Sequence, residues 1–183
     1  MLIIYDFISY TDVFTYNITT LESLLIYAMK TITYQSDYLG NGFEFATINQ
    51  PDDYEGKVVA TVIRKQCSMP SNKAVLYVHG FNDYFFQSEM AQKFNEKGFH
   101  FYAVDLRKYG RSTLPHQKSN NMRSLTEYFA DLDEALDIVR QEGNEQVLLS
   151  GHSTGGLLVT LYASERVGNE KFDYLAFQIP LTF

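Results

Sequence analysis

The spacing of apolar side chains changes in a regular order along the chain from residue 42 onward. Residues 43–48 alternate apolar and polar side chains, residues 74–78 form a continuous apolar run, and Leu125 to Val139 carry apolar side chains at helical spacing. Alternation is typical of a half-buried strand, a short apolar run of a strand buried on both faces, and the third pattern of an amphipathic helix. The chain is therefore expected to alternate strands with helices.

Turn and capping residues set the limits of these elements. Gly98 and Gly143 are placed to end two helices, and Ser124 with Glu127 forms a capping box that begins the second of them. Turn residues over 51–56 predict a hairpin between the first two strands. The predicted strands cover residues 43–48, 57–64, 74–78, 99–106, 146–149 and 172–179. The predicted helices cover residues 86–97 and 125–142, and a further helix is predicted to begin after residue 154.

Residues 1–35 have a different character. Polar and aromatic residues are mixed there without a steady period, and Thr19 to Glu22 forms a capping box ahead of a short helix through Met29. We expect an N-terminal arm over residues 1–35 and one domain over residues 36–183.

Strands that alternate with helices indicate an α/β fold with a mostly parallel sheet, here of about six strands with an N-terminal hairpin, flanked by helices. Ligands bind such sheets at the carboxyl ends of the strands. This rule places His79-Gly80-Phe81, Asp105 and the turn at residues 151–155 on one edge of the sheet. A long polar loop at residues 107–121 follows the fourth strand and is expected to be functional or mobile.

Composition narrows the classes of partner. The net charge of -7 disfavours nucleic acid and anionic membrane surfaces, so a small or neutral ligand is expected. A single cysteine, Cys67, gives no sign of an oxidising compartment, and the protein is placed in the cytoplasm by default. The apolar run at residues 21–29 is about half of the ~20 residues that a membrane-spanning helix needs, so no integral membrane segment is expected. Metal-binding and nucleotide-binding motifs are absent from the sequence, and no cofactor or metal is predicted.

One stretch carries the strongest chemical signal. An apolar run at residues 146–149 meets Gly151-His152-Ser153-Thr154-Gly155, and helix-compatible sequence follows at once. A strand, a sharp turn and a helix form a nucleophile elbow, in which the serine sits at the bend. Glycine at both ends of the motif leaves room where a Cβ atom would collide with neighbouring backbone.

These residues resemble the α/β-hydrolases, and within them the branch of monoglyceride lipases, lysophospholipases and serine aminopeptidase-like hydrolases. Three features agree in order and spacing: His79-Gly80-Phe81 after the third strand, residues 105–112 after the fourth, and residues 151–156 after the fifth. The likeness covers roughly residues 38–179 and leaves the N-terminal arm outside.

The resemblance implies a role for each matching residue. Ser153 would be the nucleophile, and the backbone N–H groups of Phe81 and Thr154 would form the oxyanion hole, which stabilises the negative charge of acyl transfer. Asp105 would have a structural role. The glycines of the loop and elbow that the resemblance carries over are Gly80, Gly151 and Gly155.

The acid and the histidine of the triad are not identified, because α/β-hydrolases place both after the serine and no histidine follows Ser153. Of the four histidines, His79 is interpreted as structural, His152 as packed locally, His100 as remote from the functional edge, and His116 as a solvated loop residue. The sequence is therefore expected to be the N-terminal portion of a hydrolase, without the cap and the last strands. Its sixth strand would then lie at the sheet edge and favour self-association or accept a complementing C-terminal segment.

Two functions remain open. The first is a serine hydrolase of carboxylic esters, lysophospholipase-like or monoacylglycerol lipase-like, with a small-molecule ester or lipid substrate, an acyl-enzyme at Ser153, and activity impaired by the missing triad residues. The second is a catalytically inactive remnant or binding scaffold with the same fold.

Overall fold

The computed structural model describes residues 32–166, 168 and 171–178. The helix predicted within the N-terminal arm lies outside the described residues and stays a prediction. The compact unit that contains the sheet begins at Thr33. Among the described residues, no helix combines the length and the apolar character needed to cross a membrane.

A single mixed sheet forms the centre of this unit, and it has the strand order β1-β2-β3-β5-β4-β6-β7. The first half is antiparallel (β1–β2, β2–β3 and β3–β5), and the second half is parallel (β4–β5, β4–β6 and β6–β7). The α/β prediction with its N-terminal hairpin is confirmed. The strands are β1 (Gln35–Ser36), β2 (Glu44–Asp53), β3 (Gly56–Lys65), β4 (Lys73–Val78), β5 (His100–Asp105), β6 (Gln146–His152) and β7 (Tyr174–Gln178).

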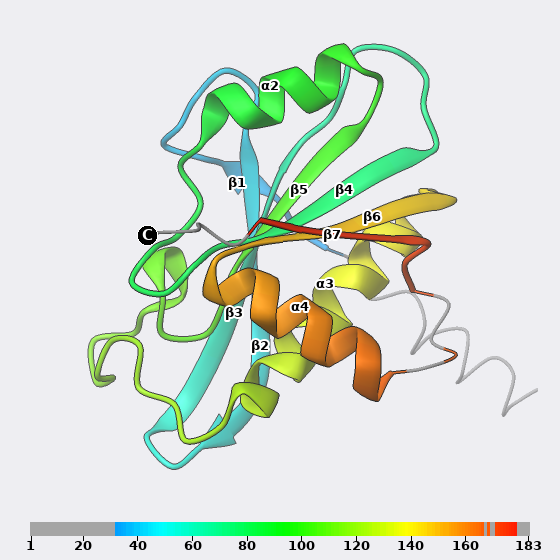
Figure 1. The fold of residues 1–183 in the computed structure, drawn as a ribbon. Coiled ribbons are helices and arrows are strands. Elements are labelled where there is room, and N and C mark those ends of the chain that lie inside the picture. The colour runs from blue at the N-terminus through cyan, green and yellow to red at the C-terminus, as the bar shows by residue number, and fades with distance from the viewer. Residues whose placement is uncertain (1–31, 167, 169–170, 179–183) are drawn as a thin grey trace, which may run out of the picture. The chain divides into compact units, whose positions relative to one another are not determined.

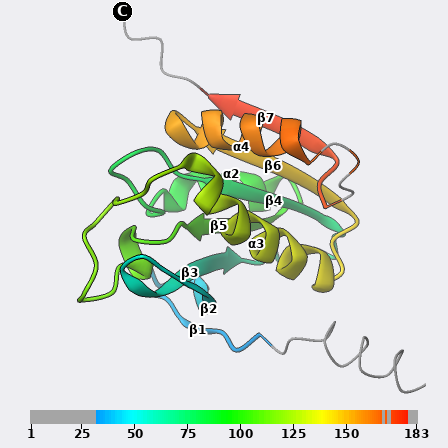
Figure 2. The same ribbon diagram turned by 90° about the horizontal axis from the view of Figure 1, so that it is seen from below.

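The strand β1 was not predicted, because two residues are too few to show an alternating pattern. Within the described residues, three α-helices cover the sheet: α2 (Ser88–Glu96) lies on one face, while α3 (Phe129–Gln141) and α4 (Thr154–Glu165) lie on the other (Figures 1 and 2). The short segments η1 (Gly110–Ser112) and η2 (Leu125–Tyr128) are 3-10 helices.

Local sequence signals explain where the helices begin and end. Gly98 and Gly143 each follow a helix with a positive φ, as predicted for residues beyond a C-cap. Both bonds of the capping box between Ser124 and Glu127 are present. The turn that this box begins is the 3-10 helix η2, so α3 itself begins four residues later than the predicted helix.

The apolar run of β4 is buried because helices cover both faces of the strand. Val75 and Tyr77 belong to the cluster on the α2 face, which also includes Phe85 and Ala91. The alternate residues Ala74, Leu76 and Val78 point to the opposite face and are fully buried there. The continuous run therefore reflects burial on both faces, as expected for a central strand.

The sheet changes direction at β4. The chain leaves β4 for β5 on one side and then returns past β4 to β6 on the other side. At such a switch point the loops that leave the two strands diverge, and a crevice opens at the carboxyl ends of the strands. The His79-Gly80-Phe81 loop and the Ser153 turn leave β4 and β6 at this point.

The polar loop after β5 was expected to be functional or mobile, and in the structure its first residues are anchored by buried charges. Arg107 forms a two-pronged contact with Asp131 of α3, with N–O distances of 2.8 and 3.1 Å. Lys108 is 1 % exposed, and its Nζ lies 2.6 Å from carboxylate oxygens of Asp53 and Glu55. The sequence shows that these residues are charged, but their partners become neighbours only through folding.

Candidate active site

Ser153 occupies the bend between β6 and α4. Its backbone has φ 54° and ψ -122°, a conformation that residues with a Cβ atom rarely adopt. The side chain is half-buried and makes no capping hydrogen bond to the helix that follows. The strained turn therefore presents a hydroxyl that the helix does not use.

Glycines on both sides of the bend permit this geometry. A Cβ atom on Gly151 would lie 2.6 Å from the carbonyl carbon of Gly155 and 2.7 Å from the nitrogen of Gly156. A Cβ atom on Gly155 would lie 2.5 Å from the carbonyl oxygen of Val78. Since every one of these neighbours is backbone, α4 can begin close to the end of β4 only if both residues are glycine.

The loop after β4 reaches the serine directly. A Cβ atom on Gly80 would lie 3.3 Å from the Cβ atom of Ser153, so the two motifs are adjacent although they are far apart in sequence. Thr154 is the first residue of α4, and its N–H belongs to the first helical turn, where amides have no partner within the helix. The helix dipole adds partial positive charge at the same end.

A small pocket of about 10 Å³ lies between the loop after β4 and the start of α4, next to Ser153. Phe81, Thr154 and the two glycines Gly80 and Gly155 contribute to its lining, together with His79. The structure thus brings together the nucleophile candidate, the loop and the helix start that the sequence assigned to one site.

His79 holds the loop in place through both ring nitrogens. Its Nδ1 lies 2.8 Å from the carbonyl oxygen of Gly80, and its Nε2 accepts a hydrogen bond of 3.2 Å from the N–H of Leu106. The acceptor role of Nε2 assigns the ring proton to Nδ1, which then donates to Gly80. Burial lowers the pKa of His79 from its ordinary value and favours this neutral form.

Asp105 anchors the turn after β5. The carboxylate is fully buried and accepts hydrogen bonds from the N–H of Phe85 at 2.8 Å and from the guanidinium of Arg111 at 2.8 Å. Arg111 in turn donates to Asp37 at 2.7 Å. These bonds give Asp105 the structural role that the family resemblance implies.

Among the described residues, none of the other three histidines is bonded to Ser153, and His152 makes no hydrogen bond there. His100 accepts from the N–H of Cys67 at 3.3 Å, and its other nitrogen lies 3.2 Å from the carbonyl oxygen of Ser71. This position is at the start of β5, opposite the functional edge. His116 is exposed, with Nε2 3.1 Å from the carbonyl oxygen of Lys57. The described residues therefore assign no triad histidine, and the triad acid also remains unassigned.

Two aromatic residues of the pocket were not singled out from the sequence. Tyr109 and Tyr128 line it, and their ring centroids lie 6.1 Å apart in an edge-to-face arrangement. A signal for Tyr128 was available, because Leu125, Tyr128 and Leu132 recur at the spacing of one helical face.

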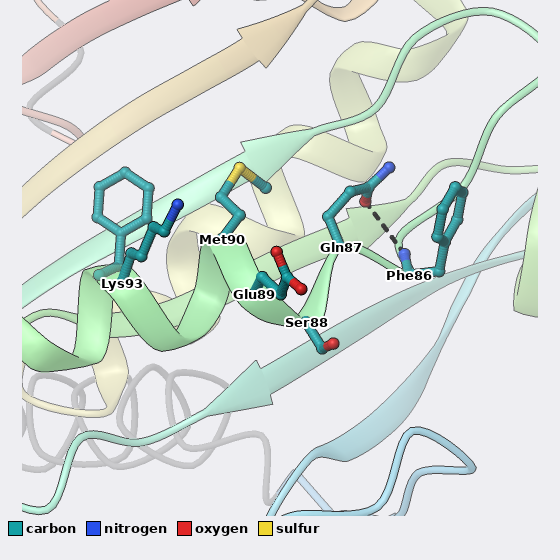
Figure 3. Close-up of a pocket in the computed structure, with 7 residues that line it drawn as sticks. Phe86, Gln87, Ser88, Glu89, Met90 and Lys93 are labelled. Carbon is teal, nitrogen blue, oxygen red and sulfur yellow. Dashed lines mark hydrogen bonds between the residues drawn. The ribbon is translucent and has the colours of Figure 1, made fainter.

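A larger groove lies elsewhere, along α2. It has a volume of about 620 Å³ and is lined by residues 86–90 together with Lys93 and Phe94 (Figure 3). The N–H of Phe86 donates to the side-chain oxygen of Gln87 at its end, at 3.1 Å. None of the predicted site residues lines this groove, so it is separate from the Ser153 site.

Comparisons with known proteins agree with this arrangement. The family model for serine aminopeptidase, S33, matches residues 69–179, which is more than half of the chain. A comparison with curated protein sequences finds no match.

Solved structures show the same fold. A highly thermostable carboxyl esterase from Bacillus coagulans is similar at a TM-score of 0.61 and 21% identity, over 73% of this chain and 43% of that one. Acetyl xylan esterase 1 from Thermoanaerobacterium is similar at a TM-score of 0.56 and 16% identity, over 85% of this chain and 58% of that one. An epoxide hydrolase from Vigna radiata is similar at a TM-score of 0.53 and 19% identity, over 84% of this chain and 42% of that one. The chain thus spans about half the length of these structures.

The family match begins just before β4 and continues to the end of β7, so it covers the loop after β4, the turn after β5 and the Ser153 elbow. These are the segments that the structure brings to one edge of the sheet. With its sheet order and its matched segments in agreement, the chain belongs to the serine aminopeptidase S33 family and has the α/β-hydrolase fold.

Proposed function

We propose that Ser153 is the nucleophile of a hydrolase that cleaves carboxylic esters through an acyl-enzyme. One observation carries the proposal: the hydroxyl-bearing residue is held in a strained turn at the start of α4, directly beside the Gly80 loop. Strained turns of this kind occur where a side chain must be presented for chemistry. The family match and the esterases among the similar structures support the same reaction class.

The proposed reaction has two steps. The Ser153 oxygen attacks the ester carbonyl carbon and forms a new C–O bond, while a general base takes the hydroxyl proton. The carbonyl oxygen becomes an oxyanion that accepts hydrogen bonds from the N–H groups of Phe81 and Thr154, each worth about 3 kcal/mol of barrier in comparable sites. The C–O bond to the alcohol then breaks, the alcohol leaves with a proton, and water releases the acid from Ser153.

Apolar side chains near the serine favour a substrate with a hydrocarbon acyl chain. Phe81 is 59 % exposed and Leu157 is 54 % exposed, and they belong to the loop and the helical turn on either side of Ser153. Exposed apolar groups of this size often mark ligand-binding surfaces. We therefore propose a lipid ester, of the lysophospholipase or monoacylglycerol lipase type, as the substrate class.

The general base is the missing component of this proposal. His79, His100 and His116 are each bonded to backbone atoms of residues other than Ser153. His152 is not bonded to Ser153 either, so the described residues supply the nucleophile without a bonded base. Loss of triad members lowers rates by orders of magnitude and leaves the contribution of the oxyanion hole and of binding. This observation favours a second candidate, a binding scaffold without turnover.

A fluorophosphonate probe separates the two candidates, because it forms a covalent bond only with an activated serine. We expect slow labelling of the 183-residue chain at Ser153, identified by peptide mass spectrometry, and none in Ser153→Ala. Ser164→Ala, at the exposed end of α4, is the matched control and should label like the wild type. Absence of any Ser153-dependent labelling after prolonged incubation would refute the hydrolase proposal and favour the scaffold.

A further inference from the structure

The loop after β4 carries the proposed oxyanion donor at Phe81, and the chain turns sharply there. Phe81 is 59 % exposed, and the next residue, Asn82, has φ 54°, in the left-handed region that is uncommon for residues other than glycine. Among the described residues, no backbone–backbone hydrogen bond joins residues 81–84 to another segment. Since a strained turn keeps its shape only where its surroundings hold it, side-chain contacts are needed to fix this one.

The long loop after β5, residues 107–121, supplies such contacts. The side-chain Nδ2 of Asn120 donates a hydrogen bond of 3.2 Å to the side-chain oxygen of Asn82. In addition, a Cβ atom on Gly110 would lie 2.5 Å from the Cβ atom of Tyr84, so the two loops also pack closely at a second point. The turn that carries Phe81 is therefore held by the loop after β5.

The loop after β5 can hold its neighbour because it is fixed itself. The N–H of Asn120 donates to the carbonyl oxygen of Lys108 at 3.1 Å, which closes the loop at its base. The Lys108 side chain is buried, and its Nζ lies 2.6 Å from carboxylate oxygens of Asp53 and Glu55, in the hairpin between β2 and β3. One line of contacts thus runs from this hairpin through Lys108 and Asn120 to Asn82.

The same line of contacts holds most of the left-handed backbone in this part of the chain. Five of the described residues other than glycine have a positive φ, and three of them are Asn82, Lys108 and Asn120, with φ values of 54°, 63° and 58°. A fourth is Ser153. Backbone strain of this kind persists where the surrounding structure imposes it, and it clusters at functional sites. This clustering indicates that the fold imposes the arrangement of these loops.

We propose that Asn120 is a positioning residue for the proposed oxyanion hole. Its side-chain amide holds Asn82 in the left-handed turn and thereby keeps the N–H of Phe81 directed at the space beside Ser153. Neither asparagine lines the pocket beside Ser153, so the role is to position the donor and not to bind the substrate. The proposal rests on the proposed function of Ser153, because a directed oxyanion donor serves a reaction at that serine.

The variant Asn120→Gly tests this role, because it removes the side-chain amide while glycine adopts a φ of 58° readily. Labelling of Ser153 is measured over a range of fluorophosphonate concentrations. We expect the limiting labelling rate to fall about two- to tenfold, the range that one hydrogen bond supplies, and the half-saturating probe concentration to stay unchanged. A wild-type labelling rate in Asn120→Gly would overturn the positioning role.

The second partner of the bond gives a stricter test. If Asn120 acts through Asn82, the double variant Asn82→Gly, Asn120→Gly should label no more slowly than Asn82→Gly alone. Losses that multiply in the double variant would show that the two residues act independently and would overturn the proposal. Asn41→Gly is the matched control, because Asn41 also has a positive φ, 48°, but lies in the exposed turn before β2, and it should label like the wild type.

A measurement without the probe separates this inference from the proposed function. The amide ¹⁵N order parameters of Phe81 and Asn82 should fall in Asn120→Gly from the rigid range, about 0.85, toward the flexible range, below about 0.6, and should stay unchanged in Asn41→Gly. Order parameters that remain in the rigid range in Asn120→Gly would overturn the positioning role. A wild type that does not label refutes the function of Ser153, and the order parameters still decide whether Asn120 holds the turn.

Discussion

Backbone strain at Ser153 gives a prediction about stability that is independent of activity. At φ 54° and ψ -122°, a residue with a Cβ atom is strained, and such strain costs about 1–3 kcal/mol. Glycine adopts this conformation without the penalty, but it loses about 0.5–1 kcal/mol more conformational entropy on folding. We therefore expect Ser153→Gly to raise the free energy of unfolding by about 0.5–2 kcal/mol.

The structure adds a second reason for this direction. The Ser153 side chain makes no capping hydrogen bond, so deleting its hydroxyl leaves no partner unpaired in the helix. For a domain of this size a gain of 1 kcal/mol corresponds to a rise in melting temperature of about 2–4 °C.

Urea titration and calorimetry of three variants measure the effect. Ser153→Ala keeps the Cβ atom and the strain, so its stability should stay within about 0.5 kcal/mol of the wild type. Asn41→Gly is the control for a positive φ in an exposed turn, where φ is 48° and asparagine is tolerated, and it should gain little. If Ser153→Gly were no more stable than Ser153→Ala, the inference that the turn stores strain would be wrong.

Three further predictions concern other parts of the domain. Gly155→Ala should destabilise by about 3 kcal/mol in urea titrations, because its Cβ would meet the backbone of Val78; a loss under 1 kcal/mol would contradict the close approach. Burial lowers the pKa of His79, so as the pH falls the unfolded chain binds the proton first. At pH values below about 6.5 the free energy of unfolding should therefore decrease by up to about 1.4 kcal/mol per pH unit. The same pH dependence in His79→Gln would count against this. Leu175 and Phe177 of the edge strand β7 are 37 % and 53 % exposed, so we expect the 183-residue chain to self-associate in size-exclusion chromatography. The double variant Leu175→Lys, Phe177→Lys should elute as a monomer. A wild type that is monomeric at all concentrations would refute this.

Local patterns predicted the parts of the fold that depend on near neighbours in sequence. The alternation in β2, the apolar run of β4 and the capping box at Ser124 each depend on residues within one element, and all three were confirmed. The Ser153 turn was predictable for the same reason, since its glycines and its serine form one short motif. The short strand β1 escaped prediction because its only signal is the partner strand β2.

Contacts between distant segments could not be predicted in this way. Arg107 and Asp131 are both charged residues of ordinary appearance in the sequence, and their pairing exists only because α3 packs beside the end of β5. His79 could be interpreted as structural, but its bond to the N–H of Leu106 requires β4 and β5 to be adjacent. Tyr128 lines a pocket that four separate segments build, and the sequence does not show that these segments meet.

The sequence by itself determined the order of strands and helices, the strained turn at Ser153 and the membership of these motifs in one family of folds, because periodicity and short motifs are properties of the local chain. The tertiary structure decided which groups are adjacent: it placed Gly80 against Ser153, bonded both nitrogens of His79 to backbone atoms, and brought Tyr128 and Thr154 into the lining of one pocket. These contacts depend on the switch in chain direction at β4, where the loops that leave β4 and β6 border one crevice, and spacing along the chain does not reveal which atoms face it.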